Sequence, residues 1–378
     1  MKKALLIAPK SSVIELFCSA NISALKELGF SVCCASNFSD SEHSGAVREK
    51  LASEGVGTAD FPFERASFIK NRKVIPLLRK YLREERFDIV HCNTETGGFL
   101  TYLASGKGDG TKYVYTPHGF SFYKGSSLLS RVVYKNIDRA ICRRMAANIA
   151  INKEELECMR SWNAKTAFFS HGIGVDTLEI AAAKPDRAAK RRELGIPEDA
   201  FLVLSVGELN ENKNHETVMR AVAGLEDTGV YYLICGEGKL RGYLTEAAER
   251  LGIADRVIMP GFRYDMPEIF RIADVFAFMS VHEGLAVSLM QAMAARLPAV
   301  VSEIRGNVDL IEDNRGGFLI SEPHDEGECG KKLERLIKDK ELRERFGAFN
   351  EKKVLEFSRE NVRKEIKEIY RSVLERDE

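Results

Sequence analysis

The strongest chemical signal in the chain is a strand–turn–helix unit that carries acidic and amide side chains. An apolar run, Val275–Met279, leads into a turn at residues 280–284, and apolar spacing predicts a helix over Val287–Ala295. The free N–H groups and the positive dipole end of that helix favour an anion, and Glu283 can accept hydrogen bonds from hydroxyl groups. Glu283 and Gln291 are eight residues apart, so both project from one side of the unit. The segment predicts a site that binds an anion and hydroxyl groups.

This arrangement resembles the Glu-x7-Glu segment of the family 4 retaining glycosyltransferases, with Gln291 in the place of the second glutamate. The resemblance implies that Glu283 holds the hydroxyls of a donor sugar and that Gln291 meets the ribose of its nucleotide. The residues expected beside the donor in the same segment are Gly284, Leu285, Ala286 and Val287. No Asp-x-Asp occurs in the chain, so we expect no metal and no other cofactor, and the nucleotide sugar is a substrate.

A second donor-side loop begins at Gly207, after a predicted strand. Glycine lets the backbone turn and approach a ligand, and Lys213 is a point charge suited to a diphosphate. Family members usually carry an arginine where this chain has Glu208, so half of the usual diphosphate clamp is replaced. The branch that resembles bacterial exopolysaccharide transferases also shows Gly-Glu-Leu at this position. The alternative for Lys213 is a surface lysine in a helix-capping loop.

Three more loops on the donor side follow predicted strands. The glycines from Gly236 onward are spaced one residue too widely for a dinucleotide fingerprint, so we reject a nicotinamide site. They either let backbone amides approach the nucleotide or make a tight turn. The resemblance places Phe262 at the border of the nucleobase. Arg263 either replaces the missing clamp arginine or pairs with Asp265, and Arg305 is a second candidate for the phosphate.

The best signal in the N-terminal half is residues 115–125, Tyr-Thr-Pro-His-Gly-Phe-Ser-Phe-Tyr-Lys-Gly. It resembles a His-Gly-Phe-x-Phe-Tyr-Lys-Gly run of the exopolysaccharide branch, which implies that His118 is catalytic and lies beside the donor sugar. The alternative is a histidine that satisfies its own loop. Asn93 stands where relatives commonly carry a second histidine. The residues expected on the acceptor side are Ser12, Asn93, Thr94 and Lys124.

Short β-type runs alternate with helical segments along the chain, which is typical of parallel sheets with crossover helices. The strands predicted in the first half are Ala4–Ala8, Ser31–Ala35, Ile89–Cys92, Tyr113–Thr116, Asn148–Ile151 and Thr166–Phe169. Those predicted in the second half are Phe201–Val206, Val230–Cys235, Arg256–Met259, Val275–Phe278, Ala299–Val301 and Phe318–Ile320.

The resemblance implies a GT-B fold of the α/β class, with two Rossmann-like doubly wound domains and a cleft between them. Residues 1–175, with a C-terminal crossover helix at 358–378, are expected to form the acceptor domain, and residues 176–357 the nucleotide-sugar donor domain. A chain of 378 residues is long enough for two cored domains.

Charge and cysteine content narrow the class of protein. The formal net charge is zero, so we expect no nucleic-acid partner. Residues 1–180 nevertheless hold 25 Lys/Arg against 19 Asp/Glu, which indicates that the first half faces something anionic. The eight cysteines form no CxxC pair and mostly lie in apolar runs, so we expect buried free thiols in a reducing compartment.

The first residues briefly imitate a signal peptide, but the apolar run is cut by Pro9, so a first strand is the better interpretation. We therefore expect a cytoplasmic protein, with any membrane contact being peripheral on the inner face of the cell membrane. The basic run at 70–73 and the predicted helix Val74–Glu85 either form a patch for anionic lipid or are a solvated helix face that packs on its sheet.

Together these features predict a retaining, metal-independent glycosyltransferase of the hexosyltransferase type. It would move a sugar from a nucleotide-sugar donor, UDP-linked, to an undecaprenyl-linked or other glycan acceptor in surface polysaccharide biosynthesis. One alternative is a catalytically weakened GT-B subunit that binds a donor or a partner, motivated by Glu208, Asn93 and Gln291. Another is a GT-B nucleotide-sugar epimerase, which needs further acid/base carboxylates and histidines in the cleft. The chain has only seven histidines, few of them in loops, which argues against this alternative.

Overall fold

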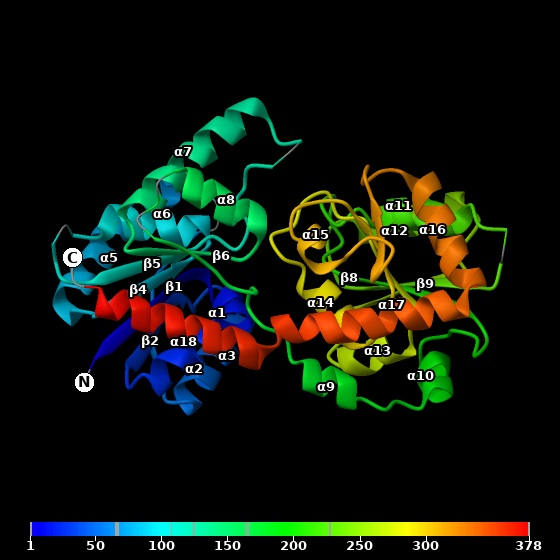
Figure 1. Cartoon of the computed structure of the whole chain (residues 1–378), viewed down its shortest axis with the longest axis horizontal. Coiled ribbons are helices and arrows are strands. Elements are labelled where there is room, and N and C mark those ends of the chain that lie inside the picture. The colour runs from blue at the N-terminus through cyan, green and yellow to red at the C-terminus, as the bar shows by residue number, and fades with distance from the viewer. Residues whose placement is uncertain are drawn as a thin grey trace. The chain divides into compact units, whose positions relative to one another are not determined.

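The computed structural model describes residues 2–64, 68–106, 108–123, 125–162, 164, 166–226 and 228–376. The chain divides into two compact units (Figure 1): Met1–Gly174 with Arg359–Glu378, and Val175–Ser358. Each unit is a parallel sheet with helices on both faces, so the predicted α/β class with two Rossmann-like domains is confirmed.

The first unit is built on a parallel sheet that, over the described residues, has seven strands in the order β3-β2-β1-β4-β5-β6-β7. The strands are β1 Lys3–Lys10, β2 Ser31–Asn37, β3 Gly57–Asp60, β4 Ile89–Asn93, β5 Lys112–Thr116, β6 Ala147–Ala150 and β7 Ala167–Phe169. The prediction missed β3, because Gly-Thr-Ala-Asp is a short, half-exposed edge strand without an apolar run. It also ended β1 too early, since that strand continues past Pro9 through a shift in register.

Helices cover both faces of this sheet, and the last helix of the chain returns to it. The helices are α1 Ser11–Phe17, α2 Ser19–Glu27, α3 Glu42–Ser53, α4 Phe68–Asn71, α5 Val74–Glu85, α6 Thr94–Ala104, α7 Leu128–Arg144, α8 Lys153–Ser161 and α18 Arg359–Glu375. The helix α18 lies along α2, and its apolar residues Val362, Ile366 and Ile369 join the core on that face of the sheet.

The apolar stripe of the basic helix α5 packs on the sheet, as in the second alternative considered from the sequence. Val74, Leu78 and Leu82 are buried in the core. Among the described residues no helix is long and apolar enough to cross a membrane.

The second unit repeats the design with a parallel sheet of six described strands in the order β10-β9-β8-β11-β12-β13. The strands are β8 Phe201–Val206, β9 Val230–Cys235, β10 Val257–Gly261, β11 Val275–Phe278, β12 Ala299–Ser302 and β13 Gly317–Ile320. The helices are α9 Thr177–Ala182, α10 Arg187–Glu193, α11 His215–Ala223, α12 Arg241–Arg250, α13 Met266–Ile272, α14 Val287–Ala294, α15 Asn307–Leu310, α16 Glu326–Lys338, α17 Lys340–Lys353 and the 3-10 helix η1 Val354–Phe357.

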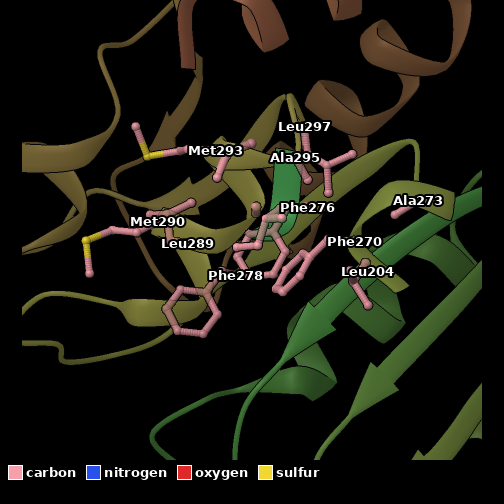
Figure 2. Packing of buried hydrophobic residues seen from close by; sticks show 14 of the residues in the cluster. Leu204, Phe270, Ala273, Phe276, Phe278, Leu289, Met290, Met293, Ala295 and Leu297 are labelled. Carbon is pink, nitrogen blue, oxygen red and sulfur yellow. The ribbon is translucent and has the colours of Figure 1, made fainter. Parts of the chain in front are cut away.

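The two faces of this second sheet are filled by alternate side chains of the same strands. On β11, Phe276 and Phe278 enter one core, whereas Val275 and Ala277 enter the core on the opposite face. Figure 2 shows Phe276 and Phe278 among the side chains of the first of these cores, with Leu289 and other residues of α14 beside them. The β11 strand and the helix after it are therefore anchored by burial, and the loop between them is fixed at both ends.

A buried histidine links α18 to the first sheet. Nδ1 of His91 is 2.7 Å from the hydroxyl of Tyr370, which also accepts from Nδ2 of Asn21 at 2.9 Å. Nε2 of His91 is 2.8 Å from Oγ1 of Thr116. Burial, with a smaller contribution from His118, lowers the pKa of His91 to about 3. The imidazole is thus neutral, and it joins β4, β5 and the C-terminal helix.

Stability of this unit should therefore fall on acidification through His91. In the unfolded chain the histidine is protonated near pH 6.5, whereas the folded His91 is protonated only near pH 3. The unfolded state therefore binds the extra proton between these values, and stability is lost as pH falls through them. The free energy of unfolding should be lower near pH 5 than near pH 7. We expect urea unfolding to show that His91→Gln removes about 2 kcal/mol of this difference. The exposed His43→Gln is the control. An undiminished pH difference in His91→Gln would contradict the assignment.

Candidate active site

The predicted donor-side residues gather at the carboxyl ends of β8 and β11, which are neighbours in the second sheet. The order in which successive strands are added to the sheet changes direction at this pair. From β8 the strands β9 and β10 extend to one side, and from β11 the strands β12 and β13 extend to the other. In open α/β sheets ligands bind beyond the carboxyl ends of the strands at such a switch point. The loops that follow these two strands carry Lys213 and Glu283.

Lys213 and Glu283 form an ion pair across the switch point. Nζ of Lys213 is 2.6 Å from Oε1 of Glu283, and the two side chains are only 20% and 11% exposed. The ammonium also lies 4.9 Å from the ring centroid of Phe278, at the end of β11. A Cβ on Gly207 would lie 3.3 Å from Cγ, Cδ and Cε of Lys213, so glycine here makes room for the lysine stem. The pair places a cation and a carboxylate side by side at one sheet edge.

Two asparagines, neither of them predicted from the sequence to be in the site, hold this lysine loop in place. Nδ2 of Asn212 donates to the carbonyl of His282 at 2.9 Å, and the N–H of Val281 donates back to the carbonyl of Asn212 at 2.8 Å. Asn214 has φ of 50° and donates to the carbonyl of Met279 at 3.0 Å. The recurring asparagines from residue 210 to 214 were the available signal, because asparagine favours left-handed turns and bonds to backbone.

Arg305 supplies a second cation at the same edge, from the loop after β12. It is 8% exposed, its Nη2 is 2.5 Å from Nε2 of His282, and its Nε is 3.5 Å from the carbonyl of Glu283. The next residue, Gly306, has φ of 82°, and a Cβ there would lie 2.4 Å from the carbonyl oxygen of Gly284. Arg305 and Lys213 therefore both contact Glu283, one at its backbone and one at its carboxylate.

The helix α14 begins directly after this loop, as the sequence predicted. Leu285 and Ala286 precede it, Ala286 is the N-cap without a side-chain cap, and Val287 is the first helical residue. Leu289, Met290, Ala292 and Met293 are buried, whereas Val287 and Gln291 are only half-buried. Gln291 lies one turn beyond Val287, which packs against the edge of the core, so this side of α14 is only partly covered.

Other donor-side residues have different surroundings. A Cβ on Gly236 would lie 1.9 Å from the carbonyl oxygen of Gly207, so this glycine allows the loops after β8 and β9 to pack together. Glu208 is exposed. Arg263 follows the ion-pair alternative, because its Nε and Nη2 contact the two carboxylate oxygens of Asp265 at 2.8 and 2.5 Å. Nη2 also lies 2.6 Å from Glu193, which leaves this guanidinium balanced by two carboxylates.

The residue next to Arg263 is an exposed aromatic. Phe262 is 62% exposed at the end of β10, and its ring centroid lies 5.0 Å from that of Tyr264 in an edge-on arrangement. Tyr264 itself is 94% exposed. Two solvated rings at the carboxyl edge of the sheet offer a face on which a planar group can stack.

In the first unit, His118 and Asn93 meet at the carboxyl ends of β4 and β5. Nε2 of His118 is 2.9 Å from Oδ1 of Asn93, which is fully buried. Nδ2 of Asn93 faces the carbonyl of His91 at 3.4 Å, which sets the orientation of the amide. His118 therefore donates from Nε2, and Nδ1 carries the lone pair. Two non-glycine residues adopt positive φ here, Thr94 at 66° and His118 at 58°.

The ring of His118 is held neutral with one nitrogen unused. Its burial lowers the pKa to about 3. Nδ1 is buried and, among the described residues, has no hydrogen-bond partner. The ring lies 4.8 Å from that of Phe17, and the loop after it is held by Glu155, whose Oε1 accepts from the N–H of Phe120 at 3.1 Å. Nδ1 is thus a positioned hydrogen-bond acceptor that is buried and unsatisfied among the described residues.

The remaining acceptor-side predictions are spread over neighbouring elements. Ser12 is half-buried in α1, directly after β1, which is the strand beside β4. Thr94 opens α6, and Lys124 lies outside the described residues. The structure therefore brings Ser12, Asn93, Thr94 and His118 to the carboxyl ends of three adjacent strands.

A doubly wound sheet with a paired cation and carboxylate at its switch point defines an α/β protein with a ligand site at that edge of the sheet. Residues 186–353 match the family described as glycosyl transferases group 1, and residues 17–176 match glycosyltransferase family 4. The chain is 32% identical over 325 residues to the putative glycosyltransferase EpsD of Bacillus subtilis, covering 84% of this chain and 85% of that protein.

A second relative is the UDP-Gal:alpha-D-GlcNAc-diphosphoundecaprenol alpha-1,3-galactosyltransferase of Escherichia coli, 28% identical over 263 residues and 67% of each chain. Among solved structures, Anabaena HepE in complex with UDP aligns with a TM-score of 0.80 at 20% identity, covering 98% of this chain and 100% of that one. WaaG, a lipopolysaccharide biosynthesis glycosyltransferase, aligns with a TM-score of 0.74 at 17% identity, covering 97% and 99%. The chain belongs to the GT-B glycosyltransferases and is a glycosyltransferase enzyme.

The orientation of His118 can be tested without substrate. A carboxylate facing Nε2 stabilises imidazolium, so Asn93→Asp should raise the pKa of His118 from its depressed value towards neutrality. Long-range proton–nitrogen NMR spectra of the histidine rings, recorded across pH, would follow this titration. Asn37→Asp, at the end of β2 in the same unit, is the control. An unshifted His118 in Asn93→Asp would show that the two side chains are not bonded.

Proposed function

We propose that this glycosyltransferase moves a sugar, with retained anomeric configuration, from a UDP-linked donor to a lipid-linked glycan acceptor in bacterial surface polysaccharide synthesis. The observation that carries the proposal is the Lys213–Glu283 pair at the switch point. Support for the nucleotide comes from HepE, whose structure contains UDP, and support for the acceptor comes from the diphosphoundecaprenol galactosyltransferase. Retention rests on the resemblance of Glu283 and Gln291 to the Glu-x7-Glu segment.

On this proposal the second unit binds the donor. Lys213 and Arg305 would meet the diphosphate, together with the free N–H groups at the start of α14. Glu283 would then accept from the hydroxyls of the donor sugar, because an ionised carboxylate is an acceptor only. Gln291, which is half-buried on α14, would contact the ribose, and Phe262 would lie against the base.

Catalysis would then be positioning and electrostatic stabilisation of a departing diphosphate. The nearby cations can meet the leaving-group charge without a metal. Arg263 would contribute little to stabilising the leaving group, because Asp265 and Glu193 already neutralise its guanidinium.

The first unit would receive the acceptor at the carboxyl ends of β1, β4 and β5. The neutral His118 can accept a hydrogen bond from a substrate hydroxyl at Nδ1, since Nε2 is engaged with Asn93. Ser12 and Thr94 offer hydroxyls beside it.

The decisive experiment on the donor site compares UDP with uridine. Lys213→Met should weaken UDP binding on the order of 10-fold to 100-fold, because it removes a charge-assisted bond to phosphate. Uridine, which lacks the diphosphate, should bind the variant as it binds the wild type. Lys239→Met is the charge-matched control, because Lys239 lies on a neighbouring loop, 69% exposed and paired with Glu211. Calorimetric titration decides between the outcomes, and equal losses for UDP and uridine would make Lys213 a structural residue.

A metal-independent mechanism predicts that chelation leaves transfer largely intact. Purified protein assayed with a UDP-sugar and acceptor should retain its rate in excess EDTA, since Lys213 and Arg305 would supply the positive charge. Loss of transfer in EDTA with recovery on addition of magnesium or manganese would contradict this part of the proposal.

A further inference from the structure

The loop that carries His118 is tied to the first turn of α6. There, Oε1 of Glu95 accepts a hydrogen bond from the N–H of Ser121 at 2.5 Å, and Oε2 accepts one from the hydroxyl of Ser121. Asn93, two residues before Glu95, bonds to the ring of His118. One short segment therefore holds both the imidazole and the backbone three residues beyond it.

The backbone on both sides of this contact is strained. Thr94 has φ of 66°, His118 of 58° and Gly119 of 112°, all in the left-handed region. Residues other than glycine keep such angles only where the surrounding structure imposes them. The rings of Phe120 and Phe122 are buried in the core with their centroids 4.9 Å apart, which fixes the far end of the loop. Hydrogen bonds between these two points therefore determine how the His118 ring is presented.

A second carboxylate supports the same loop from α8, but it has another task as well. Glu155 is fully buried, and one of its oxygens accepts from the N–H of Phe120. The other oxygen accepts from the N–H of Ile151 at 3.2 Å, so this residue also ties α8 to the end of β6. Both oxygens of Glu95, in contrast, bond to Ser121. Glu95 is therefore the more selective residue to change.

Close packing of α6 against β5 lets Glu95 reach Ser121. A Cβ on Gly98, one turn after Glu95, would lie 2.5 Å from Cε2 of Tyr115, so glycine here makes room for the tyrosine ring. The hydroxyl of Tyr115 donates to Oδ1 of Asp138, which is fully buried on α7, at 2.8 Å. Burial, and then the charge of Glu95, raises the pKa of Asp138 well above its usual range. Asp138 is thus the protonated member of this pair of carboxyl groups, and Glu95 is the acceptor for Ser121.

We propose that Glu95 is a positioning residue for sugar transfer, which holds Ser121 and, through the loop, holds the His118 ring where the reaction needs it. The inference rests on the proposed role of His118 in transfer. Glu95 itself touches no reacting atom, because Ser121 uses both of its oxygens. Misplacing a reacting group by about 1 Å can lower a rate on the order of 100-fold, so the loss of two bonds to this loop is enough to affect transfer.

The first measurement needs no substrate. Long-range proton–nitrogen NMR spectra should show the His118 ring of the wild type neutral, with its hydrogen on Nε2. Glu95→Ala should raise the pKa of His118 towards its ordinary value, because a released loop admits water to the ring. Loss of the negative charge alone would act in the opposite direction. An unchanged or lowered pKa of His118 in Glu95→Ala would overturn the inference.

Glu95→Gln is the conservative variant that should restore the wild-type spectrum. Its amide oxygen can accept from the N–H of Ser121, and its amide nitrogen can donate to the Ser121 hydroxyl oxygen. Circular dichroism and UDP titration of each variant show whether it is folded. If Glu95→Gln, folded as the wild type is, raises the pKa of His118 as much as Glu95→Ala does, the bonds to Ser121 are not what positions the ring, and the inference is overturned.

The second measurement is kcat at saturating donor and acceptor. Glu95→Ala should lower kcat on the order of 10-fold to 100-fold and leave the affinity for UDP unchanged, since the proposed donor residues lie in the second unit. Added to His118→Ala, the same substitution should lower kcat by no more than about twofold further, because both changes act through one ring. Losses that multiply in the double variant would make Glu95 a structural residue and overturn the inference.

Glu42→Ala is the matched control, because Glu42 is an exposed carboxylate in the first turn of α3 in the same unit. It should leave the His118 spectrum and kcat as they are in the wild type, and a change equal to that of Glu95→Ala would overturn the inference. A loss of kcat in His118→Ala without a loss in Glu95→Ala overturns the inference alone. If His118→Ala keeps the wild-type kcat, the proposed role of His118 fails and the inference fails with it.

Discussion

The ion pair between Lys213 and Glu283 joins the loops of β8 and β11, and the rest of the donor edge is built around it. Partly buried ion pairs add little stability beyond what apolar packing would supply, because both charges lose water. The pair instead positions two groups for a ligand, because it holds a cation and a carboxylate 2.6 Å apart at the sheet edge. A diphosphate sugar can replace each partner, since its phosphate suits the ammonium and its hydroxyls suit the carboxylate.

Residues in the neighbouring loops hold the two members of that pair in position. Gly207 leaves space for the lysine stem, Asn212 ties the lysine loop to the glutamate loop, and Gly306 lets the Arg305 loop approach Gly284. The first unit uses the same device with neutral groups. There Asn93 fixes His118 so that one ring nitrogen is bonded and the other, which is buried, has no partner among the described residues. In both units the side chains follow adjacent parallel strands, so the sheets determine which groups can meet.

Much of the fold could be predicted from the sequence, because long apolar runs such as Phe201–Val206 encode buried parallel strands. The edge strand Gly57–Asp60 could not, since it has no apolar run. Lys213 and Glu283 could be named one by one, but their pairing could not be predicted. They are 70 residues apart, and only the strand order brings them together. Apolar spacing also could not tell which helix faces solvent, because Leu78 is buried on α5 while Leu129 is exposed on α7. The roles of these site residues stay predictions.

The most direct test of the account is the affinity of Glu283→Gln for UDP, measured by calorimetry beside its rate of sugar transfer. If the pair exchanges partners on donor binding, neutralising the carboxylate frees Lys213, so UDP should bind as tightly as in the wild type or more tightly. Transfer should fall steeply, because the amide no longer accepts strongly from the sugar hydroxyls. A variant that loses UDP affinity and keeps its transfer rate at saturating donor would contradict the account.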